Sequence, residues 1–317
     1  MKTPLDGKVT WLPTPAAGSD STAPVVPRRV KHLTRGQGHG PIVRLMSPSD
    51  LGQALKPFVF LDIFDMDQAD LHAMVVGGGM PIHPHSGIAT VTVLTQGRLD
   101  YDDPDAGCGT IGYGGVEWMS AGGGVWHGKE MSPPADVTRV QGFQLWLALP
   151  RDVENAKPQS RYIEVEGMQA AGPAHVILGV HLGVASPVPA PAGVNYLLVT
   201  LRAGECWNYQ PPEGHTVGWL ALASGAAVAG VAVCAGDMVL FENGEGVISV
   251  QASDDEGAVL VLGSAVPHPY ELHLGCYSVH TSEQALTKGE NRIRELERQL
   301  KDEGDRRTKS GTVPIFG

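Results

Sequence analysis

The sequence predicts an all-β protein made of two β-barrel domains with a short helix near the C-terminus. Short runs of β-branched and aromatic residues recur along the chain, and clusters of Gly, Pro, Asn and Asp separate them. The 41 glycines and 24 prolines suit many short strands joined by turns better than long helices. A length of 317 residues exceeds one typical hydrophobic core and accommodates two.

Residues 1–27 are rich in Pro, Ala, Ser and Thr and show no hydrophobic period, which predicts a flexible N-terminal arm. We expect the first barrel over residues 28–160 and the second, with the helix, over residues 161–317. The stretch from Pro150 to Pro173 is the expected crossover between them.

Elements of the first half follow from local chemistry. Ser47–Asp50 predicts the cap of a helical turn that ends at Leu55. Gly97 and the cluster Asp103–Gly107 predict turns. Short apolar or alternating runs predict strands over Phe58–Phe64, Ile88–Leu94, Arg98–Asp102, Val116–Met119 and Phe143–Leu149. This spacing is typical of an antiparallel barrel or sandwich.

The second half shows the same pattern and then a helix. Predicted strands cover His175–Gly179, Asn195–Leu201, Val217–Ala223, Ala227–Val233, Asp237–Phe241 and Ala258–Gly263. Thr281 and Gln284 form a capping box. An apolar face is marked by Leu286, Ile293, Leu296 and Leu300, so we expect this helix to pack against a barrel.

Composition and charge exclude several classes of protein. Hydrophobic residues make up 42% and charged residues 18%, which predicts a folded chain. The net charge of −11 disfavours direct nucleic-acid binding. No apolar run approaches the length of a membrane span or a signal peptide, so we expect a cytoplasmic protein without a membrane partner. The four cysteines form no C-x-x-C pair, and we expect free, mostly buried thiols.

The segment His83-Pro84-His85 carries the clearest chemical signal. Residues i and i+2 of a strand project to the same face, and the proline keeps the segment extended. A third imidazole, His127, follows a glycine-rich turn, and Glu130 lies three residues further. Such a set suits iron, manganese, nickel or copper, with zinc also open. The alternative to a metal site is a set of histidines with purely structural roles, because short motifs also match by chance.

Several motifs resemble those of the pirin family of bicupins. Gly77 before His83 and His85 resembles the first cupin motif, and Gly124-Val125-Trp126-His127 resembles the second. Longer segments are similar to pirin signatures, namely Met80–Thr92, Gly112–His127, Gln144–Leu147 and Gly275–Thr281. The resemblance covers residues 28 to 304 and implies two cupin (jelly-roll) barrels with one metal, in the N-terminal barrel.

The resemblance also implies a ligand set and an activity. The ligands would be His83, His85, His127 and Glu130, holding one transition metal that we expect to be Fe²⁺. The implied activity is that of a metal-dependent, quercetinase-like oxidoreductase, quercetin 2,3-dioxygenase, with an aromatic flavonol substrate and Glu130 as the proton acceptor. Two alternatives stay open: an iron-dependent redox sensor that binds a regulatory protein partner, and a metal-free scaffold.

The sequence departs from the family pattern at the site. Lys129 stands where the family has its glutamate, and Glu130 follows one position later. A one-residue offset reverses the face of a strand, and a bulge at Gly128 would restore it. Ala89 replaces a glutamate that could orient a histidine, and Ser86 replaces an arginine. In the second half we expect His215 to lie in an exposed loop.

Overall fold

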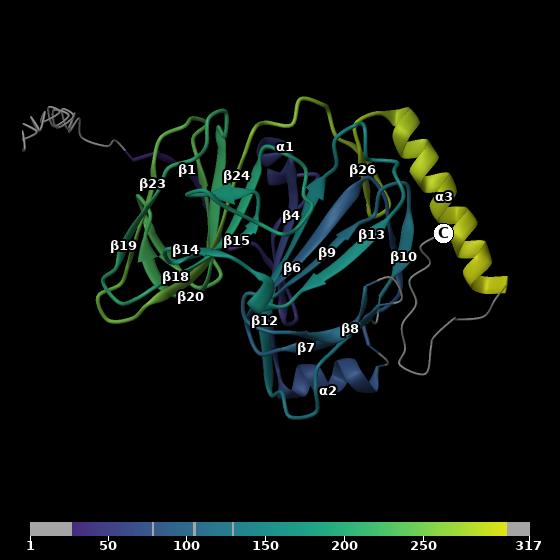
Figure 1. Ribbon diagram of the computed structural model, residues 1–317, viewed down its shortest axis with the longest axis horizontal. Helices are drawn as coiled ribbons and strands as arrows, with labels where there is room; N and C mark the ends of the chain where they lie inside the picture. The colour runs from purple at the N-terminus through teal and green to yellow at the C-terminus, as the bar shows by residue number, and fades with distance from the viewer. Residues whose placement is uncertain (1–26, 78, 104–105, 129, 303–317) are drawn as a thin grey trace, which may run out of the picture.

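Two large antiparallel sheets dominate the computed structural model, which describes residues 27–77, 79–103, 106–128 and 130–302 (Figure 1). The first sheet has seven strands, in the order β13 (Gln159–Ile163), β9 (Val116–Ser120), β6 (Ile88–Gln96), β12 (Arg139–Ala148), β4 (Phe58–Asp67), β3 (Ile42–Met46) and β2 (Gln37–His39). The predicted arm falls on residues 1–26, which lie outside the described part of the chain.

The second sheet has ten strands and comes mostly from the second half of the chain. Seven of them follow the order β1 (Val30–Thr34), β22 (Met238–Phe241), β20 (Val217–Val228), β24 (Ala258–Ala265), β18 (Val194–Leu201), β15 (Ala174–Leu178) and β14 (Ala170–Ala171). The other three, β19 (Cys206–Tyr209), β21 (Ala232–Cys234) and β23 (Ile248–Ala252), pair off this path. The predicted all-β class is confirmed.

Four small sheets and the helices complete the described structure. The small sheets pair β5 (His83–His85) with β10 (Val125–His127), β7 (Leu99–Asp103) with β8 (Gly107–Ile111) and β11 (Met131–Ser132), β16 (Val180–His181) with β17 (Val184–Ala185), and β25 (His273–Gly275) with β26 (Ser278–His280). The helices are α1 (Leu51–Leu55), α2 (Gln68–Val76), the 3₁₀ turn η1 (Val165–Gly167) and α3 (Glu283–Asp302).

Strand β18 shows why the second half reads as continuous apolar runs. Its alternate residues Val194, Tyr196 and Leu198 face a core shared with the first sheet. The intervening Leu197 and Val199 face a core within the second half. A strand buried on both faces needs apolar residues at every position. Across the shared core, Phe58 packs edge-to-face on Trp219, with ring centroids 5.3 Å apart.

Both ends of the described chain pack across the predicted domain division. Strand β1 pairs with β22, in the sheet of the second half. The confirmed helix α3 lies on the far side of the first half, beside β10 and β26, away from the ten-stranded sheet that precedes it (Figure 1). Strand β13 runs over residue 160, the predicted boundary. The division at residues 28 and 160 therefore stays a prediction.

Several local predictions were wrong. Helix α2 was not expected, since its only sequence signal is the capping box of Asp67 and Asp70. The expected strand Ala227–Val233 is instead the end of the long β20 and the short β21. The four cysteines are free as predicted, but all four are exposed. Within the described residues, no helix is long and apolar enough to cross a membrane.

Candidate metal centre

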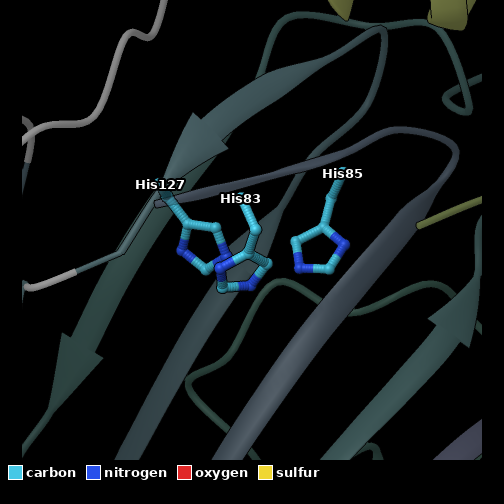
Figure 2. Close-up of side chains that lie close together, drawn as sticks. All are labelled: His83, His85 and His127. Atoms are coloured by element: carbon cyan, nitrogen blue, oxygen red, sulfur yellow. The ribbon is translucent and has the colours of Figure 1, made fainter. Parts of the chain in front are cut away.

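The pairing of β5 with β10 brings three histidines together. The two strands run antiparallel, with His127 directly opposite His83 and Val125 opposite His85. Because side chains two apart and directly opposite share a face, all three imidazoles project to one side. Their rings point toward one another (Figure 2), and one ligand nitrogen from each lies within 4.8 Å of the others. The ring centroids are 4.6–5.1 Å apart.

Backbone carbonyls fix the orientation of two of the rings. The Nδ1–H of His83 donates to the carbonyl of Pro81 at 2.8 Å, and that of His85 to the carbonyl of Tyr277 at 3.1 Å. A carbonyl only accepts, so these tautomers leave Nε2 as the free lone pair. The Nε2 atoms of His85 and His127 are buried and have no hydrogen-bond partner among the described residues. Buried polar atoms are normally paired, so these two nitrogens fit a metal ion.

Burial keeps the three imidazoles neutral. Desolvation lowers the pKa of His85 to about 3 and lowers the pKa values of His83 and His127 as well. The neighbouring imidazoles also lower the pKa values of His85 and His127, because each ring disfavours a charge on the next. A metal displaces no proton from a neutral imidazole, so the site is ready to bind at neutral pH.

Glu130 lies beside the histidines, on the Nδ1 side of His127. Its Oε1 is 3.9 Å from that nitrogen, and both carboxylate oxygens accept the amide of Gly128, at 2.8 and 3.0 Å. Gly128 has φ +140°, a conformation that side chains rarely adopt. Burial raises the pKa of Glu130 to about 7. Among the described residues, the cluster within 4.8 Å holds the three histidines alone. Ligation by Glu130 stays a prediction, and Lys129 is outside the described residues.

A small inner cavity of about 110 Å³ adjoins the histidines on the Glu130 side. His127 and Glu130 form part of its wall. The rest is largely apolar, with Ile42, Phe64, Met66, Met74, Met80, Leu99 and Met131. Its other polar residues are Asp62, Thr92, Glu117, Gln144 and Tyr162. Glu117 is buried and Tyr162 is half-buried, and burial raises the pKa of Glu117 to about 7 and that of Tyr162 above its usual range.

An open groove of about 620 Å³ adjoins the histidines on the other side, at His83. Its wall includes the stacked pair Phe60 and Trp146, whose ring centroids are 4.1 Å apart, and Tyr277. Ile42, Asp62, Met80 and Gln144 line both the groove and the inner cavity. The three imidazoles thus stand between a solvent-facing groove and a small interior space.

The second half offers no comparable cluster among its described residues. His215 is not the exposed loop residue that we expected. It is buried, and its Nδ1 lies 2.9 Å from the hydroxyl of Ser264. Of the loop that precedes it, Pro211 is buried and Glu213 is exposed, so local composition does not reveal the burial of His215.

Three residues of the site were not predicted from the sequence. Glu117 is a charged residue inside an apolar strand, a signal that was available. Tyr162 lies in the segment expected to be a crossover, where β13 forms instead. Tyr277 acts through its backbone carbonyl, so its residue type carries no signal for that role.

Comparisons with known proteins give one consistent result. A family model described as Pirin matches residues 42–147. A pirin-like protein of Caulobacter vibrioides is 33% identical over 78% of this chain and 91% of its own length. A Pseudomonas aeruginosa protein named as a candidate quercetin 2,3-dioxygenase is 27% identical over 72% of this chain and 82% of its own. The crystal structure of a quercetin 2,3-dioxygenase from Acinetobacter baumannii has a TM-score of 0.68, with 21% identity over 86% of this chain and 95% of that one.

Proposed function

This chain belongs to the pirin family, and on that basis we propose that it binds one transition-metal ion, Fe²⁺ in the cell, and acts as a dioxygenase of the quercetin 2,3-dioxygenase type. The observation that carries the proposal is the convergence of three neutral imidazoles, two of whose buried Nε2 atoms have no partner among the described residues. Imidazole ligands with open coordination positions suit non-haem iron. When bound, such an ion supplies the dioxygen chemistry that side chains alone lack.

The size of the two spaces supports a planar aromatic substrate in the outer groove. A flavonol is too large for a cavity of about 110 Å³, whereas a groove of about 620 Å³ is in the usual range of small-molecule sites. Phe60 and Trp146 provide aromatic surface in its wall. The relatives named for quercetin 2,3-dioxygenase make a flavonol the first substrate to test.

Glu130 is the residue that we propose accepts the proton of the substrate hydroxyl. Its pKa of about 7 in the metal-free protein is close to that of an effective general base at neutral pH. Accepting a proton needs the negative charge of the carboxylate, whereas ligation needs only a lone pair on one oxygen, and each oxygen keeps one beside its hydrogen bond to the amide of Gly128. Proton transfer and metal ligation are therefore separable roles that different substitutions can test.

The test combines metal analysis with turnover. Protein purified without added metal and without a histidine tag is analysed by plasma mass spectrometry, then reconstituted anaerobically with Fe²⁺. Oxygen uptake and the loss of flavonol absorbance are followed for the wild type, His85→Ala and Glu130→Gln. We expect about one metal per chain and turnover in the wild type. His85→Ala should lose both, and Glu130→Gln should keep the metal and lose turnover.

Other outcomes point elsewhere. Stoichiometric metal with no oxygen uptake would reject the dioxygenase and favour the redox sensor. No metal, even after reconstitution, would reject both metal-dependent functions and leave a cupin scaffold. Loss of metal in Glu130→Gln would show that Glu130 is a required ligand.

A further inference from the structure

The last described segment of the chain, residues 272–302, packs on the two strands that carry the histidines. Ser278 forms a parallel bridge with Ser86, and the amide of Val279 donates to the carbonyl of Ser86 at 3.2 Å. On the other strand, the indole N–H of Trp126 donates to the carbonyl of Ile293 in α3 at 2.9 Å. The hairpin β25–β26 therefore contacts the end of β5, and α3 contacts β10, beside which Figure 1 shows it.

The hairpin supplies the hydrogen bond that orients His85. Its Nδ1–H donates to the carbonyl of Tyr277, and Tyr277 has a left-handed backbone with φ +56°. A residue with a side chain rarely adopts this conformation, so the surrounding contacts must hold it there. If the hairpin moved away, the Nδ1–H would lose its acceptor and the direction of Nε2 would no longer be fixed.

A buried chain of hydrogen bonds holds the hairpin against β5. Nε2 of His280 lies 2.9 Å from the hydroxyl of Ser86, the residue after His85. Nδ1 of His280 donates to Glu154 at 3.1 Å. The amide and hydroxyl of Thr281, just before α3, donate to the same carboxylate at 2.7 and 2.6 Å. The contacts thus run without a break from the start of α3 to the neighbour of a proposed metal ligand.

The order serine, histidine, acid also occurs in hydrolases, but this one cannot act on a substrate. Ser86, His280 and Glu154 are 0%, 1% and 2% exposed. A nucleophile must reach a bound substrate, and a hydroxyl with no exposed surface does not. The arrangement therefore has a structural role. Because Ser86 directly follows His85, the structure that it holds in place includes a proposed metal ligand.

We propose that His280 is a positioning residue for the metal site, acting through Ser86 and the hairpin on His85, and that docking of residues 272–302 and metal binding stabilise each other. Coupling between two equilibria is reciprocal, so a segment that raises metal affinity is itself held more firmly once the metal is bound. The inference rests on the metal-binding part of the proposed function and not on catalysis.

Metal affinity tests the first half of this proposal. Ni²⁺ is a suitable probe, because it binds nitrogen sites more tightly than Fe²⁺ and is stable in air. We expect His280→Ala to raise the Kd for Ni²⁺ about 10–100-fold, the usual effect of losing a group that orients a ligand. His280→Gln, whose amide can still reach Ser86, should recover part of the affinity. The matched control is His215→Ala, which removes a buried His–Ser hydrogen bond in the other half.

Hydrogen exchange in the unmutated protein tests the second half and does not depend on a variant that folds. Saturating Ni²⁺ should slow exchange of the amides at 278–281 and in the first turns of α3, with little change in β19 and β23 of the other half. Each of three results would overturn the proposal. Folded His280→Ala could bind Ni²⁺ with the Kd of the wild type, His215→Ala could lose as much Ni²⁺ affinity as His280→Ala, or Ni²⁺ could leave the exchange rates at 278–281 unchanged. A wild type that binds no Ni²⁺ would overturn it too, whereas metal binding without flavonol turnover would reject only the dioxygenase.

Discussion

The hydroxyl of Thr92 donates a 2.7 Å hydrogen bond to Oε2 of Glu117 inside the first barrel. Thr90 donates to the other oxygen at 3.3 Å. No cation is among the causes that shift the pKa of Glu117, and nearby Glu130 disfavours its charge. Burial raises the pKa of Glu117 from 4.5 to about 7, so the folded protein holds a proton there that the unfolded chain releases.

This relationship makes stability depend on pH in a definite direction. The stability that the protein gains by keeping Glu117 neutral is fully present below pH 4.5, and it is lost as the pH rises through about 7. Glu117→Gln, which keeps the shape and stays neutral, should therefore stabilise the metal-free protein at pH 8 by about 1–3 kcal/mol and have little effect at pH 5. Urea unfolding at the two pH values measures the difference.

The control for this prediction is Glu256→Gln, on an exposed loop. It should shift the free energy of unfolding by less than about 0.5 kcal/mol at either pH. The same stabilisation by Glu117→Gln at pH 5 and pH 8 would show that folding does not raise the pKa of this carboxyl.

Gly87, two residues after His85, packs directly against the C-terminal hairpin. It has φ +73°, and an added Cβ would lie 2.0 Å from the carbonyl oxygen of Val279 and 2.8 Å from the ring of His280. Gly87→Ala should destabilise the protein by about 3 kcal/mol or more, since backbone strain and a steric clash add. Gly107→Ala is the matched control, with φ +85° and nothing within 4 Å of the added Cβ. It should cost about 1 kcal/mol. If thermal unfolding showed the same destabilisation for both variants, the hairpin would be able to move away from an added Cβ without loss of stability.

Bound metal should stabilise the native state by mass action. At a free Ni²⁺ concentration of about 100 times Kd, the gain is about 2.7 kcal/mol, and a chelator reverses it. His127→Ala removes one of the three imidazoles and should abolish the shift of Tm with Ni²⁺. His72→Ala, on α2, removes a histidine outside the cluster and should leave the shift intact. A shift that survives in His127→Ala would mean that Ni²⁺ binds elsewhere.

The histidine cluster could be predicted from the sequence because its geometry is local. His83 and His85 are fixed on one face by the period of a strand, and a proline between them keeps that strand extended. His127 follows a glycine-rich turn, as a cupin motif requires, and lies directly opposite His83. Nine strands of the two sheets were predictable for the same reason, since period and turn residues act over a few positions, namely β4, β6, β9, β12, β15, β18, β20, β22 and β24. Strands β1, β2, β3, β13, β14, β19 and β23 were not expected.

The environment of the cluster depends on contacts between distant positions. Tyr277 contributes a carbonyl 192 residues after His85, and no property of a tyrosine side chain predicts that. In the second half, the buried position of His215 likewise follows from how the strands pack, which local composition does not encode. Helix α2 was missed because three of its nine residues are Val or His, which have low helix propensity, and because its apolar residues have no helical period.

The last prediction concerns the pH dependence of turnover. If Glu130 accepts the substrate proton, it must be ionised, so kcat should rise with pH and level off above its pKa. That pKa is about 7 without metal, and a bound dication favours the carboxylate, so the midpoint of the rise should lie at or below pH 7. Glu130→Gln should lower kcat about 10²–10⁴-fold and abolish the rise, while Glu256→Gln should keep both. A rise with the same midpoint in Glu130→Gln would assign the proton transfer to another group. Glu117, whose carboxyl faces the same cavity with a similar pKa, would then be the residue to substitute next.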